Sequence, residues 1–207
     1  MKKSKADTVE TRKRIVAVAS RVFLAQGLAA TGIADIMAAA GLTPGGFYRH
    51  FESKEQLIAE ANSAASAQLL DVFAKATAGQ QPREALATVV SLYLDQSEQV
   101  SALCSLASLG SELRHADDHV KDIAMNGYRR MIEFVSGLTR LLGVPDPASV
   151  ADAIVSTLVG AVTISRLATD AALAQTIRDH ARAVVGSLAG KTPSPSASPA
   201  LSSPCPV

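Results

Sequence analysis

The sequence contains no tryptophan and only two cysteines, and aromatic residues make up 4% of its 207 residues. Cys104 lies in an apolar segment, and Cys205 lies near the C-terminal end. Two such distant cysteines exclude the disulfide-dense scaffold of small secreted domains and favour a reducing compartment. We therefore expect a cytoplasmic protein without structural disulfides.

Long apolar runs are also missing. Uncharged apolar segments such as residues 153–165 are shorter than the about 20 residues that a membrane-spanning helix needs. The basic start, with Lys2, Lys3 and Lys5, is followed by a charged amphipathic segment and not by the apolar centre of a secretion signal. We expect a soluble chain that keeps its N-terminus and has no membrane partner.

Motifs of catalysis are missing as well. The sequence has no nucleophile elbow and no phosphate-binding loop. His115 and His119 stand four residues apart, a spacing that suits two metal ligands on one helical face, but no further histidine or cysteine cluster completes a metal shell. A solvated polar turn is the simpler interpretation, so we expect neither an enzyme nor a bound metal or cofactor.

The small net charge of +1 conceals an asymmetry along the chain. Residues 1–54 hold nine Lys or Arg against four Asp or Glu, a balance of +5, and residues 55–207 hold eleven against fifteen, a balance of −4. A positive N-terminal segment favours a polyanionic partner, because neutralised phosphates release condensed counterions. The lysines at residues 2–5 and the basic cluster at residues 12–14 either extend such a contact or form a solvated arm.

Apolar residues recur with the 3.6-residue helical period in nearly every segment, and this predicts an all-α fold. Helices are expected to end at Gly27 and Gly41, and a long helix is expected to begin after Ser53, which forms a capping-box pattern with Gln56. We predict an N-terminal three-helix domain over residues 8–68, a larger helical domain over residues 69–189, and a disordered Pro/Ser-rich tail over residues 190–207.

Residues 31–50 carry the strongest functional signal, because they predict two short helices joined by a tight turn. Gly41 permits the left-handed backbone of the turn, Leu42 fills the angle between the helices, and Thr43 with Pro44 opens the second helix. This is the pattern of a helix-turn-helix, whose second helix enters the DNA major groove. Gly45 and Gly46 either bring the backbone close to DNA or form an irregular helix start.

Three segments together resemble the tetracycline-repressor (TetR/AcrR) family of transcriptional regulators over about residues 9–68. They are Thr31-Gly32-Ile33-Ala34-Asp35-Ile36, Ala40-Gly41-Leu42-Thr43-Pro44-Gly45-Gly46-Phe47-Tyr48-Arg49-His50-Phe51, and Ser53-Lys54-Glu55-Gln56-Leu57. Gly46 stands where the family usually has a larger side chain. The resemblance and the groove geometry give one set of expected DNA contacts: Thr31, Gly32, Thr43, Pro44, Gly45, Gly46, Tyr48, Arg49, His50 and Lys54.

The rest of the chain resembles the family only in layout. That layout implies a homodimer formed through the last two long helices, and a body that binds a small-molecule inducer of unknown identity. It also implies that the long helix after Ser53 links the ligand cavity to the recognition helix. The implied function is a sequence-specific regulator, most often a repressor, that leaves its operator when the inducer binds.

Five residues of the body are candidates for lining an inducer pocket: Tyr93, Cys104, Met125, Tyr128 and Met131. Ordinary core packing is the alternative, because methionine at helical spacing is common in cores. Cys104 also suggests a thiol-based redox or electrophile sensor, although no Lys or Arg precedes Arg114 nearby to lower the pKa of a thiol. A ligand-independent architectural DNA-binding protein is a further alternative for the whole chain.

Overall fold

The computed structural model describes residues 5–95 and 104–190, and helices form nearly all of this part of the chain. In chain order they are α1 (Lys5–Gln26), α2 (Ile33–Ala39), the 3₁₀-helix η1 (Pro44–Arg49), α3 (Lys54–Thr77), α4 (Pro82–Leu94), α5 (Ser105–Leu113), α6 (Asp118–Leu141), α7 (Pro147–Ser165) and α8 (Ala171–Gly190). No strand occurs within the described ranges, which confirms the predicted all-α fold. The tail predicted to be disordered lies outside these ranges except for Gly190.

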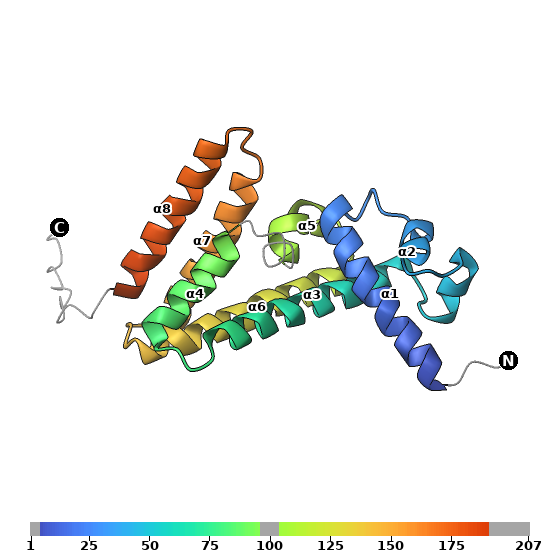
Figure 1. Ribbon diagram of the computed structural model, residues 1–207, viewed down its shortest axis with the longest axis horizontal. Coiled ribbons are helices and arrows are strands. Elements are labelled where there is room, and N and C mark those ends of the chain that lie inside the picture. Colours follow the sequence, from blue (N-terminus) through green and yellow to red (C-terminus); the bar gives the residue numbers. More distant parts are fainter. Residues whose placement is uncertain (1–4, 96–103, 191–207) are drawn as a thin grey trace, which may run out of the picture.

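Two long helices form the spine of the molecule. α3 and α6 lie side by side (Figure 1), with α1, α2 and η1 at one end and α4, α7 and α8 at the other. Gly127 of α6 allows this close approach, because a Cβ built there would lie 2.3 Å from Oγ of Ser66 on α3. α3, which begins after Ser53, therefore extends from the N-terminal helices into the body beside α6.

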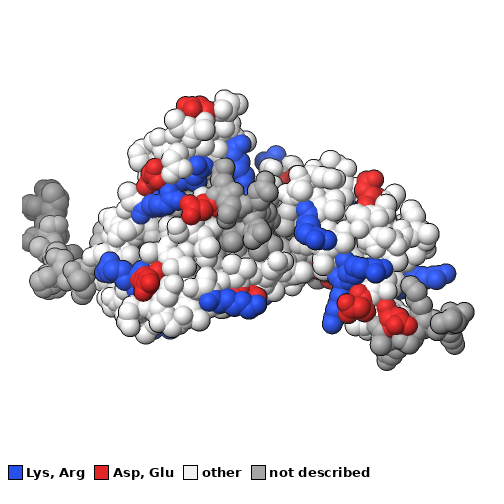
Figure 2. Space-filling model, viewed as in Figure 1, with Lys and Arg blue, Asp and Glu red and all other residues white. Residues whose placement is uncertain are grey.

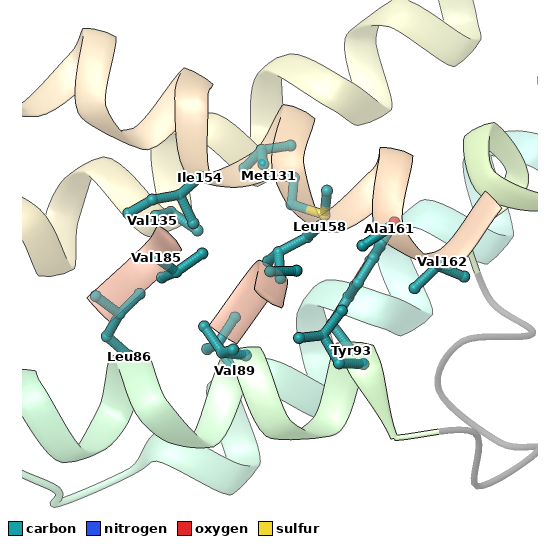
Figure 3. Packing of buried hydrophobic residues seen from close by; sticks show 14 of the residues in the cluster. Leu86, Val89, Tyr93, Met131, Val135, Ile154, Leu158, Ala161, Val162 and Val185 are labelled. Atoms are coloured by element: carbon teal, nitrogen blue, oxygen red, sulfur yellow. The ribbon is translucent and has the colours of Figure 1, made fainter. Parts of the chain in front are cut away.

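Buried apolar side chains gather in two cores. The N-terminal core contains Phe23, Phe47 and Phe51 among its largest side chains, together with Leu109 and Leu113 from α5. The body core joins α3, α4, α6, α7 and α8 (Figure 3), with Tyr93 and Leu158 at its centre. α3, α5 and α6 contribute to both cores, so the boundary at residues 68 and 69 stays a prediction.

The cap of α3 differs in part from expectation. The predicted capping box after Ser53 forms only in part: Ser53 Oγ accepts from the N–H of Gln56 at 3.1 Å, but the Gln56 side chain accepts from the N–H of Glu52 instead of Ser53. α5 begins at Ser105, and Cys104 before it has the extended backbone of an N-cap residue.

Among the described residues, α7 is the one helix with the length and composition to span a bilayer, with a mean hydropathy of 1.6. It packs against α4, α5, α6 and α8 inside the body. Only 39% of its most apolar window is buried within the chain. Part of its apolar surface therefore faces outward together with α8.

Candidate DNA-binding site

The turn between α1 and α2 is fixed by contacts from three directions. Gly27 ends α1 with a φ of +89°. The hydroxyl of Thr31 donates to the carbonyl of Gly27 at 2.7 Å, and Nζ of Lys54 on α3 donates to the carbonyl of Leu28 at 2.7 Å. From the body, Oε2 of Glu112 on α5 accepts from the N–H of Ala29 at 2.7 Å. These bonds hold the N-terminal helices against both α3 and α5.

The turn between α2 and η1 has the geometry that the sequence predicts. Gly41 has a φ of +67°, and no heavy atom lies within 4 Å of a Cβ built there. The N–H of Leu42 donates to the carbonyl of Met37 at 2.8 Å, and the Leu42 side chain packs against the N-terminal core. The chain therefore reverses through a left-handed glycine and enters η1 at a fixed angle.

η1 divides its side chains between the core and the solvent. Phe47 is fully buried and stacks on Phe51 with ring centroids 5.4 Å apart. The next residue, Tyr48, is 72% exposed and meets Phe47 edge to face. Thr43, Pro44, Gly45 and Arg49 are also exposed. Phe47 therefore anchors a short helix whose outer face carries Tyr48 and Arg49.

The two glycines of η1 are not required by packing within the chain. No heavy atom lies within 4 Å of a Cβ built at Gly45, and one built at Gly46 meets only Met37 Cε at 3.6 Å and Thr43 Oγ1 at 4.0 Å. Neither glycine has a positive φ. The missing side chains leave the start of η1 open to an external surface, and this favours close approach of a partner.

Two predicted contact residues, Thr31 and Lys54, use side-chain donors within the chain. Thr31 is 0% exposed and its hydroxyl is bonded to Gly27, so its side chain does not reach the surface. Lys54 uses one of its three ammonium donors on the carbonyl of Leu28. Gly32 lies at the N-cap of α2, where its N–H donates to Asp35 Oδ2 at 2.9 Å. His50 is half-buried beside Phe51.

Two further residues support this site through contacts within the chain. Arg12 on α1 forms an ion pair with Glu60 on α3 and lies over the Phe51 ring, with its guanidinium carbon 4.3 Å from the ring centroid. Arg12 therefore stabilises the packing of α1 on α3, whereas Lys13 and Arg14 beside it are exposed.

Glu112 is the second residue, and it holds the turn between α1 and α2 through the N–H of Ala29. Both basic and acidic side chains lie on this end of the molecule (Figure 2).

Comparison with known proteins identifies the N-terminal helices. Residues 15–61 match the family model described as "Bacterial regulatory proteins, tetR family". Residues 15–61 therefore form a tetR-type domain. This tetR-type domain is 42% identical over 59 residues to the HTH-type transcriptional regulator AcrR of Shigella flexneri, and 41% identical over 54 residues to the HTH-type transcriptional repressor BepR of Brucella suis.

These sequence matches are confined to the tetR-type domain. They cover 28% and 26% of this chain, and 27% and 26% of the two regulators. Solved structures extend the likeness in fold to the body. A TetR transcriptional regulator from Chloroflexus aurantiacus matches 89% of this chain and 94% of its own, with 28% identity and a TM-score of 0.72. A TetR-family regulator from Cytophaga hutchinsonii matches 93% and 100%, with 22% identity and a TM-score of 0.75.

The structure brings together four of the five candidates for an inducer pocket. Cys104, Tyr128 and Met131 line one cavity of about 20 Å³, and the Tyr93 hydroxyl donates to Cys104 Sγ at 2.7 Å. Met125 does not join them, because it is 41% exposed on another side of α6. The Tyr128 hydroxyl bonds to Asp152 and Ser156 of α7 at 2.5 and 2.7 Å. A cavity of this size has room for about one water molecule.

The environment of Cys104 opposes thiolate chemistry. Burial raises the pKa of the Cys104 thiol. The pKa of Tyr93 lies well above its usual value, mainly because the hydroxyl is buried and secondly because Cys104 lies beside it. A thiol with a raised pKa stays protonated at neutral pH, whereas the thiolate is the reactive form. These observations favour the packing role of Cys104 over the sensor role.

Proposed function

We propose that this chain is a dimeric, cytoplasmic, sequence-specific DNA-binding regulator, a repressor that a small molecule releases from its operator. The observation that carries the proposal is that η1 has a buried side and an exposed side. Phe47 is buried in the core, whereas Tyr48, Arg49 and the backbone at Gly45 face outward. In a helix-turn-helix the outer face of the second helix reads the major groove, and flanking donors hold phosphates. The tetR-type match over residues 15–61 supports the same role.

The expected contacts follow from what each residue exposes. Thr43, Pro44 and Gly45 at the start of η1 face the base edges, with the backbone close to the groove. Tyr48 and Arg49 reach the groove edge and the phosphates. Lys54 adds its two remaining donors at the N-terminus of α3, where the free N–H groups also favour an anion. Thr31 acts from inside by fixing the turn.

Tyr48→Ala is expected to weaken operator binding by about 5- to 150-fold, which corresponds to the one to three kcal/mol of a lost specific contact, and to leave folding unchanged. The operator is first obtained by selecting bound genomic fragments with the purified protein, and affinity is then measured by fluorescence anisotropy. Leu141→Ala is the matched control, because Leu141 is 71% exposed at the far end of α6. Unchanged affinity of the Tyr48 variant contradicts the proposed site.

Competition with unrelated DNA at moderate salt separates a regulator from an architectural protein. A regulator binds its operator at least about 10³-fold more tightly than unrelated sequences. An architectural protein binds both nearly equally. If the affinity for the selected fragments is close to the affinity for unrelated DNA, the protein is not a sequence-specific regulator, and the architectural DNA-binding protein is the remaining interpretation.

The second copy is proposed to pack on α7 and α8. Ile164 and Leu167 at the end of α7, together with Leu173 and Val184 of α8, are exposed apolar side chains. Burying them against the same surface of another copy removes this apolar area from water. Such a dimer presents two η1 helices, and binding requires their separation to match successive major grooves, about 34 Å apart.

Val184→Lys is expected to shift the protein from dimer to monomer and to weaken operator binding with it, because a buried lysine without a partner is costly. Sedimentation velocity measures the assembly, and anisotropy measures the affinity. Leu141→Lys places the same charge on an exposed apolar position of α6, outside α7 and α8. If both variants remain dimeric, the interface lies elsewhere.

A further inference from the structure

The body has an open cleft between α4 and α8, lined also by Leu142 after α6, with a volume of about 420 Å³. Its floor is apolar, formed by Leu86 and Val90 of α4 and by Val185 and Ala189 of α8. Leu86 and Val185 extend toward one another from the two helices (Figure 3). The cavity beside Cys104 measures about 20 Å³, whereas small-molecule sites span about 300–1,000 Å³. The cleft therefore has the size of a ligand site and the Cys104 cavity does not.

The cleft lies on a different side of α8 from the proposed dimer surface. Residues of an α-helix are rotated by about 100° per position, so Arg182, which lines the cleft, and Val184 lie nearly opposite one another around the axis. Gly186 lines the cleft beside Arg182. A second copy packed on Val184 therefore leaves the cleft open.

The two arginines of the cleft differ in their partners. Arg182 is neutralised by Asp95 and Asp179, with N–O distances of 2.7 Å to each. Arg83, at the other end, is exposed and forms no ion pair with any carboxylate in the described part of the chain. An anionic group entering the cleft therefore finds its available cation at Arg83, and the apolar floor extends from there toward Ser91.

We propose that this cleft binds an amphipathic carboxylate, with its head group on Arg83 and its unbranched apolar chain along Leu86, Val90 and Val185. The span from Arg83 to Ser91 is about 12 Å along α4, the length of an extended medium-chain acyl group. Arginine forms two parallel hydrogen bonds to a carboxylate, and this distinguishes the acid from a neutral alcohol of the same length. This inference rests on the proposed function, because it names a chemical class of inducer for the regulator. Binding of the ligand to the cleft can be measured without DNA.

Decanoate, used below its critical micelle concentration, is the probe for titration calorimetry with the full-length protein. We expect one decanoate per chain, at least tenfold weaker binding of decanol, and at least tenfold weaker binding of decanoate to Arg83→Gln. Gly186→Leu is expected to abolish binding by filling the cleft, because no heavy atom lies within 4 Å of a Cβ at Gly186. Thermal unfolding checks that both variants are folded. Arg129→Gln on α6 is the matched control and keeps full binding.

Two results overturn the proposed carboxylate site in the cleft. One is no decanoate binding by the parent protein, and the other is equal decanoate binding by the parent and both cleft variants. The DNA measurements are separate. A protein that binds its operator but not decanoate contradicts only the proposed carboxylate site. A protein that binds decanoate but no operator contradicts only the proposed function as a DNA-binding regulator. Decanoate that binds and also releases the operator fragment supports both.

Discussion

Phe47→Ala is expected to lower the free energy of unfolding by about 3–5 kcal/mol and to abolish operator binding. Phe47 is fully buried, stacked on Phe51, and it is the buried side chain of η1. Its removal leaves a cavity beneath the helix that carries Tyr48 and Arg49. The six residues of η1 form only short-range hydrogen bonds, so the helix depends on this anchor for its orientation. Chemical denaturation followed by circular dichroism measures the stability, and anisotropy measures the affinity.

Neighbouring substitutions separate the two roles of η1. Phe47→Leu retains most of the buried volume and is expected to cost less than Phe47→Ala. Tyr48→Ala removes an exposed side chain and is expected to change stability by no more than about 0.5 kcal/mol while it weakens DNA binding. A Phe47→Ala protein with parental stability and parental operator affinity contradicts the anchoring role of this residue.

The sequence predicts the turn of the helix-turn-helix because its signals are local. A glycine with positive φ at Gly41, an apolar residue at Leu42 and a proline at Pro44 each act on the backbone within a few residues. The outward position of Tyr48 beside the buried Phe47 also follows from the short helix. These features need no knowledge of distant segments, and the structure has them where the sequence predicts.

The partners of Lys54 and Glu112 are set by tertiary packing and could not be predicted in the same way. Lys54 meets a carbonyl 26 residues away, and Glu112 meets an N–H 83 residues away. Resemblance to a family assigns a residue type to a role but does not show whether its donor is already used. The Thr31 hydroxyl, which is bonded to Gly27, is the clearest case.

The error at Met125 has a geometric cause. Met125, Tyr128 and Met131 follow a three-residue spacing, and each such step rotates the side chain by about 60° around a helix of 3.6 residues per turn. Two steps separate Met125 from Met131 by about 120°. Tyr128 and Met131 therefore line the cavity beside Cys104, and Met125 faces solvent.

Gly27→Ala is expected to lower the free energy of unfolding by about 2–3 kcal/mol, from left-handed strain on a Cβ-bearing residue and the loss of a charge-assisted hydrogen bond. Gly27 has a φ of +89°, and a Cβ there would lie 2.7 Å from Oε1 of Glu112. The carboxylate must move, and its bond to the N–H of Ala29 is lost. Gly79→Ala is the matched control, because Gly79 has a φ of +77° with no heavy atom within 4 Å of a Cβ.

A double-mutant cycle with Glu112→Ala tests whether this contact joins α5 to the tetR-type domain. Glu112→Ala alone is expected to cost about 1 kcal/mol, and adding it to Gly27→Ala is expected to cost little more, because the hydrogen bond is already lost. Additive costs would contradict the contact. α5 begins beside the Cys104 cavity and carries Glu112 in its last turn, so this carboxylate joins α5 to the turn before α2. Denaturation of the four proteins gives the coupling energy, and the operator affinity of Glu112→Ala shows whether the same contact sets the position of η1.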